Sequence, residues 1–343
     1  MTESTSQRAA DNLSHDQLAD AVEFRDRVVE EVCRVYIGQR QTVEVILAAI
    51  LARGHVLLEG VPGLAKTTLA NATARALGCD FRRVQFTPDL LPADITGTYI
   101  LNQSTQQFEL RMGPLFAQVV LADEINRAPA KTQSALLEAM QERQVTIEGE
   151  THPLPKPFVV LATQNPAEQE GVYLLPEAQI DRFLVRVCLG YPTLHNELTM
   201  LQTYHRPPAP AKGVSSVDEI LALSARVSEV HVETSVLSYA LRLVRATREH
   251  GRVALGASPR ASLGLVQLAK AWALISGRGY VRPDDLVTLA PFALEHRVLV
   301  TTDASIEGTT SSAVIEQVLS STPVATQSSA DKTLPPSPQG DHA

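Results

Sequence analysis

Two patterns of hydrophobic and polar positions divide the chain. From Ser14 to about residue 51, apolar residues recur at helical spacing, with a break at Ile37 and Gly38, which predicts two helices. Short β-like runs follow, and the fully apolar run at residues 119–122 is typical of a strand buried on both faces of a parallel sheet. The other predicted strands lie at residues 55–59, 82–86, 158–163 and 184–188. Beyond residue 191 the pattern is helical again, at residues 194–204, 217–227, 234–250, 259–275 and 283–298.

This order predicts an α/β protein with a second, smaller domain. We expect a core at residues 15–190, in which helices flank a parallel sheet, and an all-α domain at residues 191–300. Residues 1–14 are small and polar, and residues 301–343 are rich in Ser, Thr and Pro. Both end segments are predicted to be disordered.

Two β-hairpins are predicted as insertions in the core. The first pairs residues 98–100 with residues 107–110, and the second spans residues 144–154 and turns at Gly149. Cations are scarce in both, since Arg111 is the one cation of residues 97–111 and His152 is the one basic residue of the second hairpin.

A glycine-rich turn joins the first predicted strand to a predicted helix. Its residues are Gly60, Val61, Pro62, Gly63, Leu64, Ala65, Lys66 and Thr67, and Thr68 follows in the first turn of the helix. Backbone N–H groups of such a turn face phosphate oxygens, a lysine adds charge for the β- and γ-phosphates, and a threonine hydroxyl can ligate Mg²⁺. The turn therefore predicts a site for ATP and Mg²⁺. By itself it could also be an ordinary turn that carries a lysine.

Ala65 departs from the usual phosphate-loop pattern, which has glycine directly before the lysine. Alanine readily adopts right-handed helical φ and ψ, whereas a positive φ is unfavourable for it. The loop can therefore close if Ala65 is already helical, and we expect that it could not close if φ at Ala65 had to be positive.

Polar residues follow two of the buried strands. Asp123 and Glu124 end the run that begins at residue 119, and Asn165 follows the run at residues 158–163. In α/β sheets, ligands bind at this carboxyl end of the strands. Asp123 suits the outer shell of Mg²⁺, Glu124 suits the activation of water, and Asn165 suits the attacking water or the γ-phosphate. A charged strand end and an Asn before Pro are also common without any function.

Three further places in the chain contain candidate site residues, and each also has an explanation without a function. The break at Ile37 and Gly38 could contact an adenine ring or could be a plain helix–helix turn. Arg182 beside an Asp is usually a surface ion pair. Arg260 opens a helix, which is unfavourable for a cation unless it faces a phosphate.

Composition and charge indicate which partners and which cellular compartment to expect. The net charge of -8 argues against a broad surface for nucleic acid. Cys33, Cys79 and Cys188 are far apart and form no metal-binding spacing, which fits a reducing compartment. No apolar stretch is long enough to span a membrane, and the N-terminus lacks signal-peptide features. A cytoplasmic protein is expected.

Several motifs in order resemble those of the MoxR family of AAA+ ATPases, over roughly residues 20–300. They are residues 60–67, 121–129, 162–166, 177–183 and 256–261. The family commonly has Gly-Leu-Ala-Lys-Thr in its Walker A loop, so the resemblance accommodates Ala65. It places Lys66 and Thr67 in Walker A, Asp123 and Glu124 in Walker B, and Asn165 at sensor 1.

The resemblance also implies roles in a ring. Arg182 matches the arginine finger that acts on a neighbour's nucleotide, and Arg260 matches sensor 2 on a helical lid. The two hairpins match the helix-2 insert and the pre-sensor-1 hairpin, which project toward a central pore. A homo-oligomeric ring, expected to be a hexamer, and a chaperone-like activity on protein clients follow, often beside a protein with a von Willebrand factor A domain.

Two related functions stay open as alternatives. A helicase-like nucleic-acid motor shares these inserts, but it needs Lys or Arg for phosphate contacts, and the hairpins here carry only Arg111. The motor subunit of a metal chelatase shares the architecture and would need its catalytic subunits nearby. A scaffold without catalysis is disfavoured because both Glu124 and Arg182 are present.

Overall fold

The core is built on a parallel sheet. The computed structural model describes residues 13–165, 173, 175–204 and 209–324 of the chain. Within this part, five strands form one sheet in the order β2-β5-β8-β1-β9, and every neighbouring pair is parallel. The strands are β1 (Val56–Glu59), β2 (Phe81–Gln85), β5 (Val119–Asp123), β8 (Val159–Gln164) and β9 (Val185–Cys188).

Alternate residues of the central strands enter two different hydrophobic cores. Val56 and Leu121 belong to the core that also contains α2 (His15–Val35), α3 (Arg40–Leu51) and α4 (Lys66–Ala76). Their neighbours Leu57 and Val120 belong to the core formed with α6 (Ala130–Glu142). Because side chains alternate across a strand, a strand covered on both faces has to be apolar throughout. The predicted α/β fold class is confirmed.

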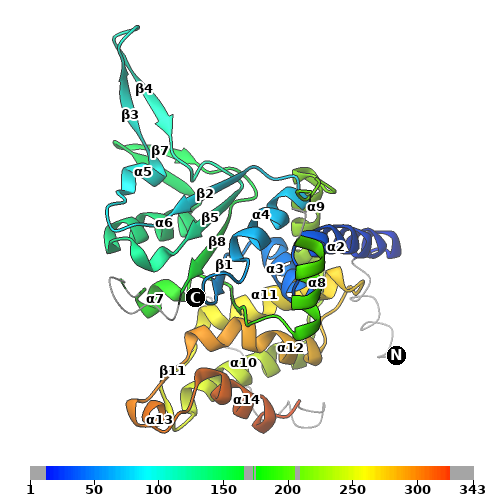
Figure 1. The fold of residues 1–343 in the computed structure, drawn as a ribbon. Coiled ribbons are helices and arrows are strands. Elements are labelled where there is room, and N and C mark those ends of the chain that lie inside the picture. The colour runs from blue at the N-terminus through cyan, green and yellow to red at the C-terminus, as the bar shows by residue number, and fades with distance from the viewer. Residues whose placement is uncertain (1–12, 166–172, 174, 205–208, 325–343) are drawn as a thin grey trace, which may run out of the picture.

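Two hairpins project from the core, as predicted (Figure 1). One consists of β3 (Gly97–Asn102) and β4 (Gln107–Met112) after the short helix α5 (Pro92–Thr96), and the other of β6 (Gln144–Ile147) and β7 (Glu150–Pro153). The Tyr99 hydroxyl donates a hydrogen bond of 2.8 Å to Glu150 Oε2 and so links the two hairpins.

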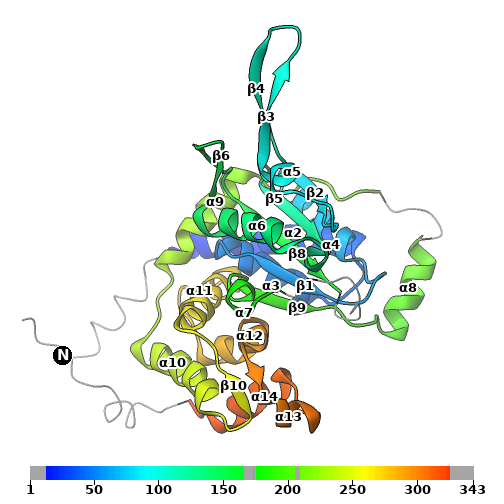
Figure 2. The same ribbon diagram turned by 90° about the vertical axis from the view of Figure 1, so that its left-hand side faces the viewer.

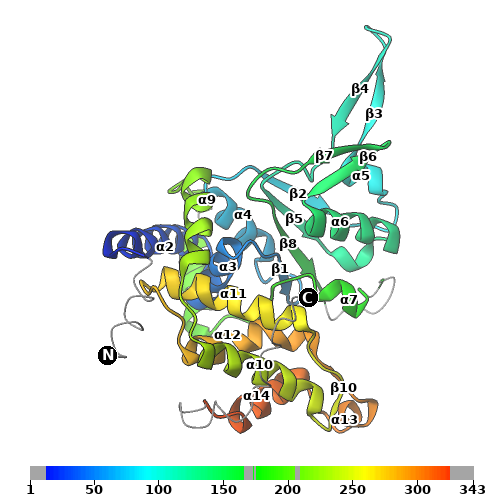
Figure 3. The ribbon, with the colours of Figure 1, turned by 180° about the vertical axis from the view of Figure 1, so that it is seen from behind.

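Helices follow the core (Figure 3). They are α8 (Leu194–Tyr204), α9 (Val217–Arg226), α10 (Thr234–Glu249), α11 (Pro259–Ile275), α12 (Pro283–Leu294), α13 (Thr302–Ile306) and α14 (Ser311–Ser321). Helix α11 packs against α2 and α3 of the core as well as against α10 and α12. Helix α8 stands at the side of the core (Figure 2). The 3₁₀ turns η1 (Ile125–Arg127), η2 (Val227–Glu229) and η3 (Glu295–Arg297), the short α7 (Glu177–Ile180), and the ribbon β10 (Val253–Leu255) with β11 (Leu299–Val300) complete the described structure.

The predicted disorder at the two ends is wrong for several residues. Helices α13 and α14 lie within residues 301–343, and α14 buries Val314 and Ile315. Each of these helices begins after a threonine whose hydroxyl accepts a backbone N–H, so part of the Ser/Thr content that indicated a tail serves as helix caps. Similarly, Leu13 is buried and Ser14 caps α2. Residues 1–12 and 325–343 lie outside the described residues.

Among the described residues, no helix combines the length and apolar character that a membrane span requires. Cys33, Cys79 and Cys188 are free thiols.

Candidate functional site

The glycine-rich loop connects the carboxyl end of β1 to the first turn of α4, with Lys66 as the first helical residue. The first N–H groups of a helix have no partner within the helix, so those of α4 are available to an anion at the loop. The Lys66 ammonium group donates to the carbonyl oxygens of Gly60 and Val61, the latter at 3.1 Å. The Lys66 side chain thus folds back onto the loop, where it is also predicted to bind phosphate.

The expectation that the loop could not close with a positive φ at Ala65 is wrong. Its backbone has φ 56° and ψ 26°, the left-handed conformation, and it is the N-cap of α4. For a residue with a Cβ atom this conformation costs about 1–2 kcal/mol. The loop therefore closes with the backbone geometry that glycine prefers, and Ala65 adopts it under strain.

Asp123 is a buried carboxylate at the end of β5, and three side chains surround it. The Thr163 hydroxyl donates to Oδ1 at 2.6 Å, Arg83 donates to Oδ2 at 2.7 Å, and the Thr67 hydroxyl lies 3.4 Å from Oδ2. A buried charge is stable only when it is paired and hydrogen-bonded, and these contacts satisfy that requirement. The contact with Thr67 brings the end of β5 to the phosphate loop.

Glu124 is held by its backbone and by its side chain. It has φ 56°, and its N–H donates to the Thr163 hydroxyl at 2.8 Å. Its Oε2 accepts from Gln85 Nε2 at 2.9 Å and lies 3.2 Å from Arg127 Nε. The carboxylate is therefore held to β2 and η1 through its Oε2 atom.

Sequence reasoning did not identify Arg83, Gln85 and Thr163. A threonine within an otherwise apolar buried run was a signal for Thr163. Arg83 and Gln85 gave no such signal, because their roles depend on the pairing of β2 with β5, in which Gln85 lies opposite Asp123.

Asn165 directly follows β8 and is buried, with 4% of its surface exposed. Strand β8 lies between β1 and β5. Lys66, Thr67, Asp123, Glu124 and Asn165 therefore belong to one edge of the sheet, which we call the carboxyl edge.

A cavity of about 310 Å³ adjoins the loop. The turn between α2 and α3, including Ile37 and Gly38, forms one wall, and the loop residues Pro62, Gly63, Leu64 and Ala65 form another. A Cβ at Gly38 would lie 2.4 Å from the Tyr36 ring, so only glycine fits there without a shift. The cavity is large enough for a flat heterocycle, and it lies where the sequence predicts contacts with an adenine ring.

The donors near the loop fit a cation that is bound mainly by other ligands. No group of three or more His, Cys, Asp or Glu side chains among the described residues could hold a metal ion. Mg²⁺ typically takes one or two protein oxygens and completes its octahedron with phosphate and water. The Thr67 hydroxyl and the Asp123 carboxylate supply such oxygens.

Arg182 and Arg260 lie at the opposite edge of the sheet. Val56 of β1 pairs with Val185 of β9, so Arg182, just before β9, lies beside the start of β1, whereas the loop follows its end. Strand β1 has 4 residues, which separates these ends by roughly 13 Å. Both arginines line a cavity of about 750 Å³ that includes no residue of the loop. We call this side the amino edge.

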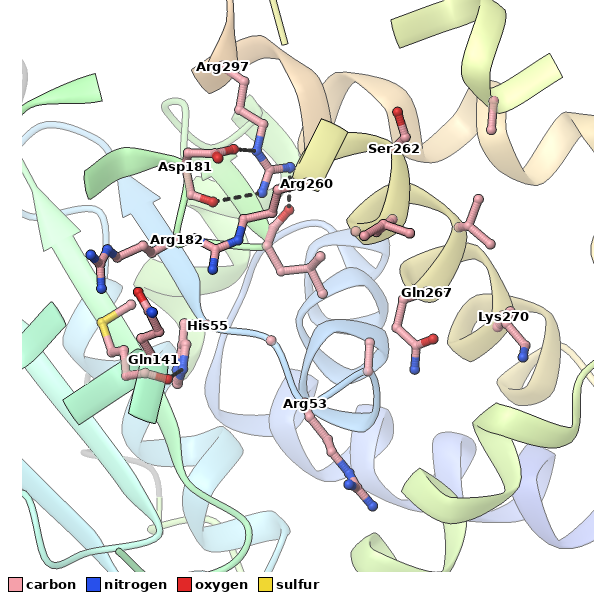
Figure 4. A pocket seen from close by; sticks show the side chains of 18 of the residues that line it. Arg53, His55, Gln141, Asp181, Arg182, Arg260, Ser262, Gln267, Lys270 and Arg297 are labelled. Atoms are coloured by element: carbon pink, nitrogen blue, oxygen red, sulfur yellow. Dashed lines mark hydrogen bonds and ion pairs between the residues drawn. The ribbon is translucent and has the colours of Figure 1, made fainter. Parts of the chain in front are cut away.

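The cavity at the amino edge is strongly cationic (Figure 4). Asp181 is the one carboxylate among the described residues that line it. The basic side chains that line it are Arg53, Arg143, Arg182, Arg260, Lys270 and Arg297. Burial and the neighbouring Arg143 guanidinium lower the pKa of His55 to about 4, so this lining ring is neutral. The positive charge of these lining residues favours binding of an anion such as a phosphate.

Comparisons with known proteins agree with this architecture. Residues 55–185 match the profile described as "ATPase family associated with various cellular activities (AAA)", and residues 245–318 match the AAA lid domain. "Chaperone MoxR1" of Mycobacterium tuberculosis is 47% identical over 88% of this chain and 82% of its own length. "Protein MoxR" of Methylorubrum extorquens is 29% identical over 82% of this chain and 90% of its own. The crystal structure of a candidate ATPase from Cytophaga hutchinsonii has a TM-score of 0.83 and 41% identity, and covers 90% of this chain and 98% of its own.

Proposed function

Since the chain belongs to the MoxR family of AAA+ ATPases, we propose that it hydrolyses ATP to ADP and phosphate in a ring of identical subunits. One observation carries this proposal. The phosphate loop and the carboxylates lie at one edge of the sheet, and the two candidate arginines lie at the other. A single chain therefore holds two half-sites that a neighbouring copy would complete.

The carboxyl edge binds nucleotide in this proposal. The loop N–H groups and Lys66 hold the phosphates, and the cavity beside Ile37 and Gly38 takes the adenine. Thr67 and Asp123 hold Mg²⁺, which when bound offsets the charge of the β- and γ-phosphates. Glu124, which Gln85 and Arg127 hold through Oε2, accepts the proton of the attacking water, and Asn165 orients that water.

The amino edge serves the next subunit. Arg182 and Arg260 would meet the γ-phosphate held by the neighbour's loop, where guanidinium groups offset the charge of the transition state. Leu241 and Leu263 line the same cavity and are 43% and 75% exposed, which fits a surface that a second copy covers. We expect the ring to be a hexamer.

We propose that this ATPase remodels protein clients. One relative is named a chaperone, and the projecting β3–β4 hairpin exposes Ile100, Leu101 and Phe108, apolar side chains suited to contact a polypeptide. A protein with a von Willebrand factor A domain is the partner we would test first, in the cytoplasm. The scarcity of cations on the hairpins favours this role over a nucleic-acid motor. The alternative function is that of a chelatase motor. Recovery of metal-insertion subunits in a pull-down with this protein would favour it.

The test mixes two inactive variants. Lys66→Ala lacks the phosphate contact but keeps both arginines, and Arg182→Ala has the reverse defect. In mixed rings some interfaces join an intact loop to an intact Arg182, so we expect the ATPase rate to recover in part and to peak at intermediate ratios. Mixed rings are verified by co-purification of two differently tagged variants. If such rings form and no ratio restores turnover, the trans assignment is wrong.

A further inference from the structure

Arg297, in η3 of the helical region, is buried, with 3% of its side chain exposed, yet it carries a charge. All five N–H groups of its guanidinium have acceptors. Nε donates to Asp181 Oδ1 at 2.7 Å, and Nη2 donates to the carbonyl oxygens of Phe183 at 2.8 Å and Asp181 at 3.2 Å. Nη1 donates to the carbonyl oxygens of Ala293 and Leu184. Only the planar fork of an arginine can make this set of bonds.

These contacts lie on both sides of Arg182 along the chain. Its two chain neighbours, Asp181 and Phe183, are among the residues whose carbonyl oxygens accept from Arg297. The side chain of Arg182 adds a hydrogen bond of 2.8 Å from Nη1 to the Leu137 carbonyl oxygen, and its buried Nε has no hydrogen-bond partner among the described residues. The backbone on both sides of the candidate finger is thus fixed by one residue from the helical region.

The same carboxylate also holds the start of α11. Asp181 Oδ2 accepts from the Ser258 hydroxyl at 3.0 Å, and Ser258 is the N-cap of α11, two residues before Arg260. Burial and the nearby Arg260 both lower the pKa of Arg297, so Arg260 lies within electrostatic reach of it. Figure 4 shows Asp181, Arg182, Arg260 and Arg297 together.

We propose that Arg297 and Asp181 are positioning residues that hold Arg182 and Arg260 in a fixed arrangement for the neighbour's nucleotide. Asp181 bridges the segment before β9 to α11, and Arg297 locks that segment to η3, so the two arginines move as one unit. The proposal rests on the trans role given above to the amino edge.

Two conservative substitutions test it. Arg297→Lys keeps the charge but cannot fill five acceptors, and Asp181→Asn keeps the shape without the charge. Misplacement of a catalytic group by about 1 Å can lower a rate ~100-fold, so we expect each variant to lose ~10- to 100-fold in kcat. The Kd for a fluorescent ATP analogue should stay within about twofold of the wild-type value, because the loop at the other edge is untouched. Arg245→Lys, at an exposed ion pair on α10, is the matched control and should keep wild-type kcat.

Complementation separates positioning from a general structural role. Mixed with Lys66→Ala, Arg297→Lys should recover part of the ATPase rate, because the two defects lie at different edges. Mixed with Arg182→Ala it should recover none, because both defects lie at the same edge.

Three results would overturn the inference: kcat equal to that of Arg245→Lys, loss of ATP affinity parallel to the loss of kcat, or equal recovery with both partners. A variant that fails to fold loses ATP affinity and counts against a positioning role, and each of the two variants is judged on its own. If Arg182→Ala and Lys66→Ala complement each other while these results occur, the trans assignment stands and only the positioning role fails.

Discussion

The two edges of the sheet carry half-sites that are built differently. At the carboxyl edge, a loop, a helix N-terminus and residues that directly follow strands provide the groups, within short stretches of sequence. At the amino edge, Arg182, Arg260 and Arg297 come from segments far apart in sequence and meet only after the helical region has docked on the core. The carboxyl edge depends on local backbone geometry, whereas the amino edge depends on tertiary contacts.

This difference separates binding from turnover. A nucleotide needs only the carboxyl edge to bind, but in the proposed mechanism hydrolysis also needs the amino edge of another copy. Substitutions in the phosphate loop should therefore change the Kd for ATP, and substitutions of the arginines at the amino edge should change kcat without changing the Kd.

The largest expected effect is at Arg182. Arg182→Ala should lower kcat by ~10³-fold or more, because an arginine finger offsets charge that develops only in the transition state. Its Kd for ATP should stay within about twofold of wild type, as checked by titration with a fluorescent ATP analogue. Lys66→Ala is the reciprocal variant, and its Kd should rise by ~100-fold through loss of a charged hydrogen bond to phosphate. If Arg182→Ala weakens binding as much as Lys66→Ala does, the two edges are not separate.

Glu124→Gln should lower kcat by ~10²- to 10⁴-fold, since the amide cannot accept the proton of the water. Binding should be retained, because shape and volume are preserved, and single-turnover measurements separate the two steps. Glu316→Gln, an exposed change on α14, is the control and should have wild-type kcat. A Glu124→Gln chain with wild-type turnover would show that another group activates the water.

The sequence predicted the carboxyl edge better than the amino edge. The strands, the loop and the hairpins depend on local patterns, and each was recognised in the right order. The conformation of Ala65 was missed because the φ/ψ preference of a single residue does not determine a backbone angle that the loop as a whole imposes. Arg83 and Gln85 were missed because they depend on strand register, and the location of Arg260 depends on how α11 packs. Helices α13 and α14 were missed because short capped helices rich in Ser and Thr have the composition of a tail.

The amino edge should also make stability depend on pH. His55 accepts from the Val160 N–H at 3.0 Å and its other ring nitrogen lies 3.1 Å from the Met140 carbonyl oxygen, an arrangement for a neutral ring. Burial and Arg143 lower its pKa to about 4 in the folded chain, so the unfolded chain binds the extra proton between about pH 4 and 6.5. The stabilisation is therefore complete above pH 6.5 and is lost as pH falls toward 4, by about 3 kcal/mol. Burial lowers the pKa of His296 well below its usual value and contributes in the same direction.

Urea titrations at pH 5 and pH 7 measure this change in the free energy of unfolding. His55→Gln can keep both hydrogen bonds without titrating, and it should reduce the difference between the two pH values. His195→Gln, on the exposed side of α8, is the control that should leave the difference unchanged. An equal difference in wild type and His55→Gln would contradict the assignment to His55.

The smallest expected effect concerns the strain at the carboxyl edge. Ala65 has φ 56°, and glycine at this position removes a penalty of about 1–2 kcal/mol. Glycine also increases the conformational entropy of the unfolded chain, which offsets about 0.5–1 kcal/mol of that gain. Ala65→Gly should therefore raise the free energy of unfolding by about 0.5–1 kcal/mol in a urea titration. Ala74→Gly, in the interior of the same helix, is the matched control and should lower it by about 1 kcal/mol or more, since no positive φ is relieved there. If both variants are destabilised alike, Ala65 is not strained in solution, and the loop closes with a right-handed conformation at this residue.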